Sequence, residues 1–177
     1  DNQLIQWESP NSILGAFYVN NVLYLQLKDK GLMSFMNSTL KIAGQGSQLS
    51  DAAVITAMLP FSENKILIAT STQGLLLLNN GIYQAFETPV QELLLKNPVT
   101  GGLNLSDGTI AFGTSRKGVV IINHAGDVLQ IIDKEASLQN SFVRSMSASN
   151  DNTLFIALNN GVSVIEIPSA FSFFDEK

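Results

Sequence analysis

The sequence KILIATSTQGLLLL (residues 65–78) contains two short apolar runs separated by a polar break. The first run extends from Ile66 to Ala69, and the second follows Gly74 as four consecutive leucines. Each run is shorter than a typical helix and the break is polar, so this stretch predicts two antiparallel strands joined by a turn. Neither run alternates apolar with polar residues, and we therefore expect protein to cover both faces of their sheet.

This pattern occurs four times along the chain. In each copy a glycine opens the second apolar run, and successive glycines are separated by 43, 44 and 43 residues: Gly31, Gly74, Gly118 and Gly161. We expect these glycines to be structural turn residues. A second marker, in a predicted hairpin turn, precedes each glycine by nine or ten residues: Asn21, Asn64, Gly108 and Asn152. A repeat of this length built from strands predicts the blades of a β-propeller.

The predicted fold is therefore all-β, with four blades of about four antiparallel strands each. They form a single propeller domain or partial propeller over residues 1–177. The expected blades are residues 13–43, 53–87, 101–133 and 142–168. Residues 87–100 are less regular, and we interpret them as a connecting segment that contains a short helix or an extra strand.

The fourth predicted blade has only three strands, and this leaves two interpretations. A strand predicted at residues 4–7 would complete the blade and close a ring of four, which removes unpaired edges. Alternatively, the four blades are an arc of a larger propeller, and residues 4–7 belong to a preceding blade. The aromatic sequence FSFF (residues 171–174) favours the arc, because it would pack on adjoining blades or on a second copy of the chain.

Composition narrows the classes of function. Hydrophobic residues make up 45% of the chain and charged residues 14%, which fits buried sheets and excludes disorder. The absence of cysteine excludes disulfides, thiolate metal sites and cysteine nucleophiles. A net charge of −5 without a long basic cluster argues against nucleic acid as a partner. No apolar run is long enough to span a bilayer as a helix, so we expect no membrane insertion by this chain.

Two stretches resemble the two-component-regulator propeller repeat. LQNSFVRSMSASNDNTLFIALNNGVSVIEI (residues 138–167) follows the family's order of an Asn loop, a strand of the V-R-S-I type, an acidic turn and two further strands. GTIAFGT (residues 108–114) matches the second half of that pattern and keeps its Gly-Thr. The repeats are degenerate, since the family's strand tryptophan is replaced in the four copies by Tyr24, Leu67, Ala111 and Phe155.

The family occurs in sensor regions of bacterial hybrid histidine kinases and related transcriptional regulators, notably of gut Bacteroidetes. The resemblance implies a periplasmic sensor region of a longer protein. A membrane span and a histidine kinase or DNA-binding output domain would then lie outside this chain. It also implies that the region binds a ligand, with an oligosaccharide or another small molecule as the expected class.

Few residues could carry catalysis. The single histidine, His124, lies in the predicted turn NHAGD, where we interpret it as a solvated turn residue. The sequence GTSRKG lacks the Lys-Ser/Thr pair that a phosphate-binding loop needs after its second glycine. Carboxylates are scattered, and no pair can be assigned to the two sides of a glycosidase cleft. We therefore expect no catalytic residues, no metal site and no cofactor.

The candidate ligand-binding residues lie in the turns that follow the second strand of each blade. In propellers these turns gather on one face with the loops between blades, where ligands commonly bind. The candidates are Lys28, Lys30, Gln73, Arg116, Lys117, Asn159 and Asn160. We predict a non-catalytic sensor that binds a ligand or pairs with another copy, so its partners would include a second chain or adjoining blades. The alternatives are an interaction scaffold without a small-molecule site and, less favoured, a carbohydrate-active propeller enzyme.

Overall fold

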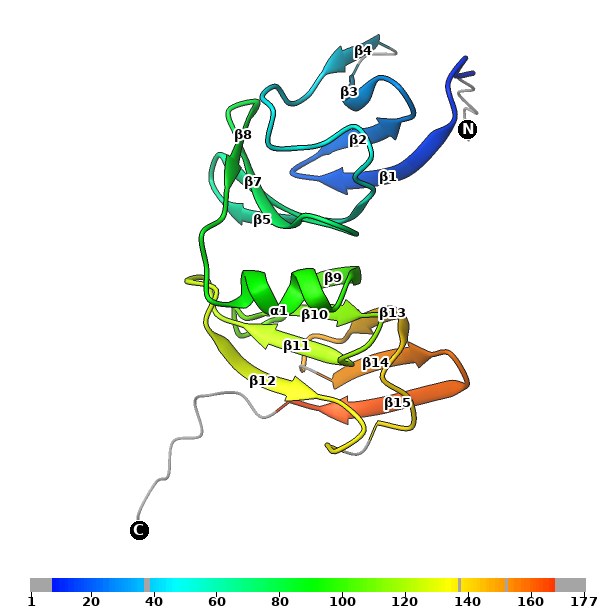
Figure 1. The fold of residues 1–177 in the computed structure, drawn as a ribbon, viewed down its shortest axis with the longest axis vertical. Helices are drawn as coiled ribbons and strands as arrows, with labels where there is room; N and C mark the ends of the chain where they lie inside the picture. Colours follow the sequence, from blue (N-terminus) through cyan, green and yellow to red (C-terminus); the bar gives the residue numbers. More distant parts are fainter. Residues whose placement is uncertain (1–7, 37–38, 137, 152, 168–177) are drawn as a thin grey trace.

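The computed structural model describes residues 8–36, 39–136, 138–151 and 153–167, which form four antiparallel sheets and one short helix (Figure 1). Within each sheet, strands that are consecutive in the sequence are neighbours. The first strand of each sheet lies beside the first strand of the next. This arrangement defines the blades of a β-propeller, and the predicted four-bladed, all-β fold is confirmed.

Each of the first three blades has four strands, and the fourth has three. Blade 1 contains β1 (Ile13–Val19), β2 (Val22–Leu27), β3 (Gly31–Met36) and β4 (Thr39–Ile42). Blade 2 contains β5 (Ile55–Ser62), β6 (Lys65–Thr70), β7 (Gly74–Asn79) and β8 (Ile82–Ala85). Blade 3 contains β9 (Val99–Asn104), β10 (Ile110–Thr114), β11 (Val119–Ile122) and β12 (Val128–Ile132). Blade 4 contains β13 (Val143–Ala148), β14 (Thr153–Leu158) and β15 (Gly161–Glu166).

Two strands are extended by shifts in their register. β9 begins at Val99, two residues before the predicted start of the third blade at residue 101, because Val99 still pairs with Thr114 across a shift in register. β5 continues to Ser62, again across a shift in register. Such irregularities insert a residue without ending the ladder, so the hydrophobic pattern alone does not reveal them.

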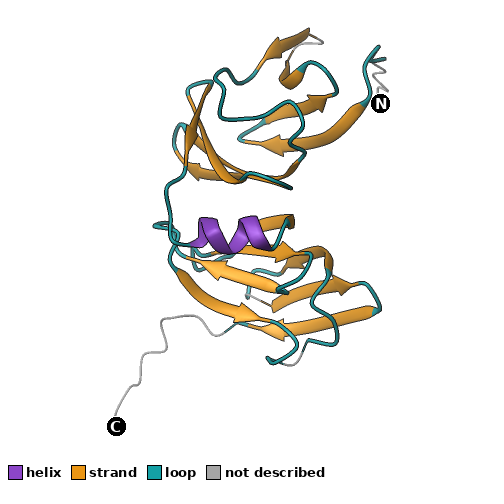
Figure 2. Cartoon of the chain, in the orientation of Figure 1, coloured by secondary structure: helices purple, strands orange, loops and turns teal. Residues whose placement is uncertain are grey.

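The segment between blades 2 and 3 contains the helix α1 (Val90–Lys96), which Figure 2 shows in purple. A short helix was one of the two structures that the sequence allowed here. Val90 and Leu94 are buried in the core between the two blades. The side-chain oxygen of Gln91 accepts a hydrogen bond of 2.9 Å from the backbone N–H of Leu75, which ties the helix to β7 of blade 2.

Three apolar cores lie at the three interfaces between consecutive blades. The central strands of blade 2, β6 and β7, are buried over nearly their whole length, as the lack of alternation in their sequence predicted. β15 behaves differently. Its residues are either exposed or half-buried, because no further blade covers the outer face of blade 4 among the described residues.

The four marker glycines begin or immediately precede the third strand of their blades, and each has a positive φ. The angles are 77° for Gly31, 69° for Gly74, 68° for Gly118 and 152° for Gly161. At Gly118 the space is closed as well, since a Cβ atom there would lie 2.1 Å from the carbonyl oxygen of Ile132. Only glycine adopts such backbone angles at little cost.

The described residues do not close a ring. β13 makes no extended contact with β1, and Figure 1 shows the blades following one another along an arc from blade 1 at the top to blade 4 at the bottom. The strand predicted at residues 4–7 and the aromatic sequence at residues 171–174 lie outside the described residues. The described part of the chain contains no helix long and apolar enough to span a membrane.

Candidate functional site

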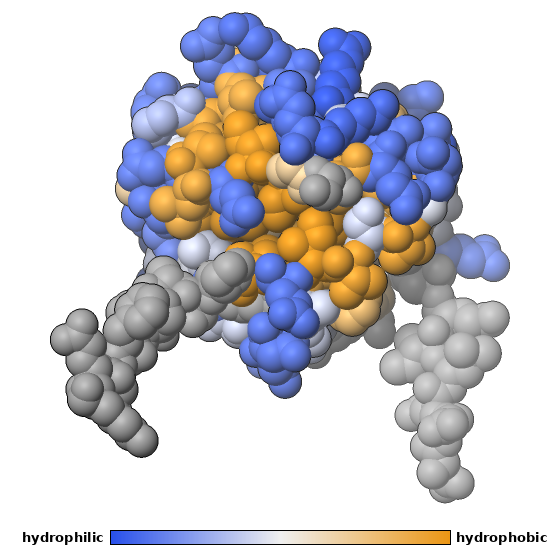
Figure 3. All heavy atoms as spheres, turned by 90° about the horizontal axis from the view of Figure 1, so that it is seen from below, coloured by the Kyte–Doolittle hydropathy of each residue, from blue (hydrophilic) through white to orange (hydrophobic). Residues whose placement is uncertain are grey.

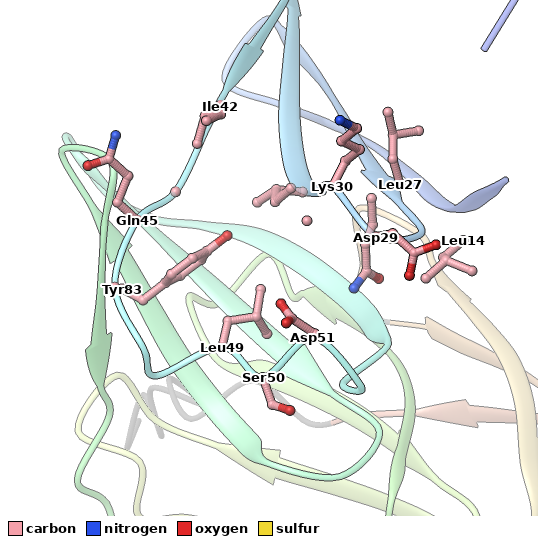
Figure 4. A pocket seen from close by; sticks show the side chains of 15 residues that line it. Leu14, Leu27, Asp29, Lys30, Ile42, Gln45, Leu49, Ser50, Asp51 and Tyr83 are labelled. Carbon is pink, nitrogen blue, oxygen red and sulfur yellow. The ribbon is translucent and has the colours of Figure 1, made fainter. Parts of the chain in front are cut away.

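A cleft of about 600 Å³ lies between blades 1 and 2 (Figure 4). One wall is the turn between β2 and β3. The opposite wall is the loop that connects β4 to β5, together with Tyr83 of β8. The cleft therefore lies on the face where the turns after the second strands meet the loops between blades. Its apolar lining comes from Leu14, Leu27, Leu32, Ile42 and Leu49.

Tyr83 points its hydroxyl group into the cleft (Figure 4). Its ring rests against the backbone of Gly44, where a Cβ atom would lie 2.3 Å from the ring carbon that carries the hydroxyl. The backbone N–H of Tyr83 donates a hydrogen bond of 3.0 Å to the carbonyl oxygen of Gln45. Burial raises the pKa of the Tyr83 phenol to about 12, so this group is a neutral hydrogen-bond donor at physiological pH.

Three charged side chains stand at the open side of the cleft. Asp29 and Lys30 come from the β2–β3 turn, and Asp51 comes from the opposite loop (Figure 4). All three are exposed. Asp29 has a φ of 64°, a left-handed conformation that aspartate tolerates in turns. Two hydrogen-bond acceptors and one ammonium donor thus line the same space as the Tyr83 hydroxyl.

The loop wall of the cleft is held by Gln73, which belongs to the turn between β6 and β7. Its side-chain oxygen accepts a hydrogen bond of 2.8 Å from the N–H of Ser50. Its amide nitrogen donates one of 2.8 Å to the carbonyl oxygen of Gln48. Because both partners are backbone atoms of the β4–β5 loop, Gln73 fixes the loop that carries Asp51.

The predicted ligand-binding residues do not gather at one place. Lys30 lines the cleft, and Gln73 supports its wall. Lys28 is exposed beside the cleft without lining it. The remaining candidates belong to blades 3 and 4 and lie outside it.

Two of these remaining candidates have partners of their own. Lys117 forms a salt bridge of 2.6 Å with Asp133, and Asn159 accepts hydrogen bonds of 3.1 and 2.6 Å from the guanidinium group of Arg144. Their side chains therefore tie turns to neighbouring segments. Arg116 and Asn160 are exposed.

Sequence reasoning did not select Asp29, Asp51 or Tyr83. The sequence could have indicated Asp29 and Asp51, because the β2–β3 turn and the β4–β5 loop that contain them were expected to lie on the same face of the propeller. Tyr83 had no such signal, because it belongs to an outer strand. Its place in the cleft depends on the missing side chain at Gly44 and on the parallel bridge between Gln45 and Ile82.

The cleft has the properties of a binding site. Apolar side chains surround a few polar groups that converge on one space, the usual composition of small-molecule sites. Both carboxylates are exposed, so each can accept hydrogen bonds from a bound molecule. Among the described residues, no group of three or more His, Cys, Asp or Glu side chains is placed to hold a metal ion.

Comparisons with known proteins give matches among solved structures. No family model matches the sequence, and no curated protein matches it. One similar structure is the extracellular domain of a proposed hybrid two component system, BT3049 of B. thetaiotaomicron. It is 21% identical with a TM-score of 0.68, and the match covers 90% of this chain and 21% of that one. The extracellular domain of BT4673 from the same organism is 19% identical with a TM-score of 0.64, covering 87% and 21%.

These matches confirm the predicted β-propeller fold, and the two extracellular domains belong to the kind of signalling protein in which the repeat resembled by the sequence occurs. This chain spans about a fifth of the length of either extracellular domain. The match to the computationally designed protein Ika4 covers nearly all of both chains, 95% of this one and 99% of the designed one. Ika4 is 15% identical to this chain with a TM-score of 0.63.

Proposed function

We propose that this chain is a non-catalytic periplasmic sensor domain that binds a small, hydroxyl-rich ligand, an oligosaccharide, in the cleft between blades 1 and 2. The observation that carries the proposal is the convergence of Tyr83, Asp29 and Asp51 above an apolar floor. Carboxylates accept hydrogen bonds from sugar hydroxyl groups, while the C–H faces of a sugar ring pack on aromatic and aliphatic side chains. The similar extracellular domains of two-component systems support the sensor role.

The cleft also offers a route from ligand to signal. Its two walls belong to different blades, so a ligand that contacts both walls stabilises one relative position of blades 1 and 2. By restricting the movement of blade 1 relative to blade 2, the bound ligand would change the signal that the chain transmits to an output domain outside it. A ligand without contacts on both walls would bind but produce no such shift.

Calorimetric titration of the chain with a panel of neutral oligosaccharides tests the proposal. We expect at least one saccharide to bind, and we expect Asp51→Asn to weaken its binding about tenfold, the loss of one charge-assisted hydrogen bond. Lys30→Ala should also weaken binding, whereas Lys28→Ala is the matched control and should not. Absence of binding by every saccharide would favour the interaction scaffold instead, and release of a cleaved sugar would show an enzyme.

A further inference from the structure

A second pocket, of about 390 Å³, lies on the face of the propeller opposite to the cleft. It is formed by the turns that join the first to the second strand in blades 1 and 2, by the end of β9, and by the turn between β11 and β12. We call it the Phe61 pocket. Its polar and aromatic lining comes from three blades and consists of Asn20, Phe61, Ser62, Glu63, Asn104 and His124.

Phe61 occupies its place because of an irregularity at the end of β5. Pro60 pairs with Ile66 and Ser62 pairs with Lys65, so Phe61 is an additional residue that has no partner in the ladder. A bulge of this kind bends the strand and redirects the side chain at the extra residue. The regular alternation of β5 therefore does not decide where the Phe61 ring lies.

The Phe61 ring is the centre of a small aromatic cluster. It is half-buried, and the Phe86 ring packs edge-on against it with a centroid distance of 5.3 Å. The imidazole of His124 lies beside it at 4.9 Å and is exposed. The sequence indicated only a solvated turn residue at His124, and it gave no sign of this contact. The phenyl and imidazole rings together provide an apolar surface that lines the pocket.

Hydrogen bonds fix the segments that carry these rings. The side-chain nitrogen of Asn104 in blade 3 donates a hydrogen bond of 2.8 Å to the carbonyl oxygen of Pro60 in the bulge of blade 2. In the turn that presents the imidazole, the side-chain oxygen of Asn123 accepts hydrogen bonds of 2.9 Å from the N–H groups of Ala125 and Asp127. A pocket whose walls are already ordered loses little conformational freedom when a ligand binds.

The polar groups of the Phe61 pocket favour a neutral ligand. The carboxamides of Asn20 and Asn104 supply donors and acceptors, and the Glu63 carboxylate supplies acceptors. None of the described residues that line the pocket is a lysine or an arginine, so a phosphate or carboxylate group would find no cationic partner there. A ring with an apolar C–H face and several hydroxyl groups matches both the aromatic and the polar parts of the lining.

The exposed surface at the blade 4 end has a different character. Figure 3 views the molecule from this end and shows a hydrophobic area bordered by polar residues. In blade 4, Phe155, Val162 and Val164 are 44%, 63% and 59% exposed. An apolar surface of this kind lacks the polar groups that converge in a small-molecule site, whereas the Phe61 pocket has them.

We propose that the Phe61 pocket is a second binding site for a neutral saccharide. A sugar ring packs on the rings of Phe61 and His124. Its hydroxyl groups form hydrogen bonds with Asn20, Glu63 and Asn104. The inference goes beyond the proposed function and does not depend on it, because no residue lines both the Phe61 pocket and the cleft.

The single histidine of the chain provides a local probe of this site. In the NMR spectrum of the chain without a histidine tag, the imidazole C–H signals come from His124 alone. The chain is titrated with glucose, galactose, mannose and xylose, each as the monosaccharide and as a trisaccharide. We expect at least one sugar to shift these signals in a saturable manner, and Phe61→Ala to weaken its binding about tenfold through loss of the stacking contact. Tyr18→Ala is the matched control, because Tyr18 is a 71% exposed aromatic residue outside the pocket.

Two further variants separate this site from the cleft. Glu63→Gln replaces an exposed carboxylate by an amide of the same shape, and it should weaken the same sugar about tenfold while the circular dichroism spectrum stays unchanged. Asp51→Asn alters only the cleft and should leave the His124 titration as it is.

The proposal is overturned if no sugar shifts the His124 signals, or if either Phe61→Ala or Glu63→Gln leaves the titration unchanged. It is also overturned if Asp51→Asn abolishes the response, since the shift would then arise from the cleft. Calorimetric binding of a sugar that leaves the His124 signals in place would support the cleft and refute the Phe61 pocket, so the two proposals fail separately.

Discussion

The side-chain oxygen of Gln26 in blade 1 accepts a hydrogen bond of 2.8 Å from the backbone N–H of Ile55 in blade 2. Its amide nitrogen donates a second one, of 2.7 Å, to the carbonyl oxygen of Ala53. Gln26 is buried, so both backbone groups have lost their contact with water. This one side chain closes the floor of the cleft and holds the first strand of blade 2 against blade 1.

Replacing Gln26 by alanine should lower the free energy of unfolding by about 3 kcal/mol, since it leaves a buried N–H and a buried carbonyl without partners. Urea unfolding followed by far-UV circular dichroism measures this loss. Gln130→Ala is a suitable control, because Gln130 is exposed on β12 and should be replaceable within about 0.5 kcal/mol. Equal effects of the two substitutions would show that the buried amide does not stabilise the inter-blade contact.

Gly44→Ala should destabilise the chain and displace the Tyr83 ring, because the new Cβ atom would lie 2.3 Å from that ring. Overpacking of this kind costs roughly 1–3 kcal/mol, and the same variant should bind the saccharide less tightly. Gly101→Ala provides the matched control, since no atom lies within 4 Å of its Cβ position. Thermal unfolding of the two variants gives the comparison, and an unchanged stability for Gly44→Ala would contradict the close packing of Tyr83.

The regular part of the fold could be predicted from the sequence because each blade repeats one physical pattern. The marker glycines fix a left-handed turn, and the apolar runs without alternation require cover on both faces. The bulge near Val99 could not be predicted in this way, because a residue added to one strand leaves the hydrophobic pattern unchanged. The pairs at the ends, such as Phe155 with Val164, look identical in sequence to buried ones, and only the structure shows that they are exposed.

The candidate site could be predicted only in part. The order of the strands predicts which face of the propeller carries the site, because it brings the turn that contains Lys30 close to the β4–β5 loop. Selecting charged residues from every blade assumed a site common to all blades, whereas the cleft lies between two of them. Lys117 lies outside this cleft, and its ammonium group forms an ion pair with Asp133.

The salt bridge between Lys117 and Asp133 should make stability depend on pH. The hydrogen bond from Lys117, together with those from the N–H groups of Ala136 and Glu135, lowers the pKa of the Asp133 carboxyl in the folded chain. Its contribution is therefore present above the unfolded pKa of about 3.9 and is lost as the pH falls through the folded value. The same ion pair raises the pKa of the Lys117 ammonium group in the folded chain, because Asp133 accepts its hydrogen bond.

Unfolding of Asp133→Asn at a series of pH values measures this contribution. We expect the variant to be less stable than the wild type near neutral pH, with a difference that shrinks as the medium becomes more acidic than the unfolded pKa. Asp127→Asn serves as the control, because Asp127 is an exposed turn residue. A difference that is constant from neutral to acidic pH would assign the effect to something other than the ionised pair.

Tyr83 should make the chain lose stability at high pH. Its pKa is raised to about 12 by burial, compared with about 10 in an unfolded chain. Between these two values the unfolded state releases the phenol proton while the folded state retains it, so unfolding becomes more favourable as the pH rises. A pKa difference of about two between the folded and unfolded states corresponds to ~3 kcal/mol of stability across this pH window.

Tyr83→Phe removes the phenol, and its stability should therefore fall less steeply than that of the wild type above pH ~10. Tyrosine absorbance gives a second readout, because the transition near pH 12 should disappear in the variant. If both proteins lose stability along the same curve, the hydroxyl of Tyr83 is solvated in the cleft rather than buried.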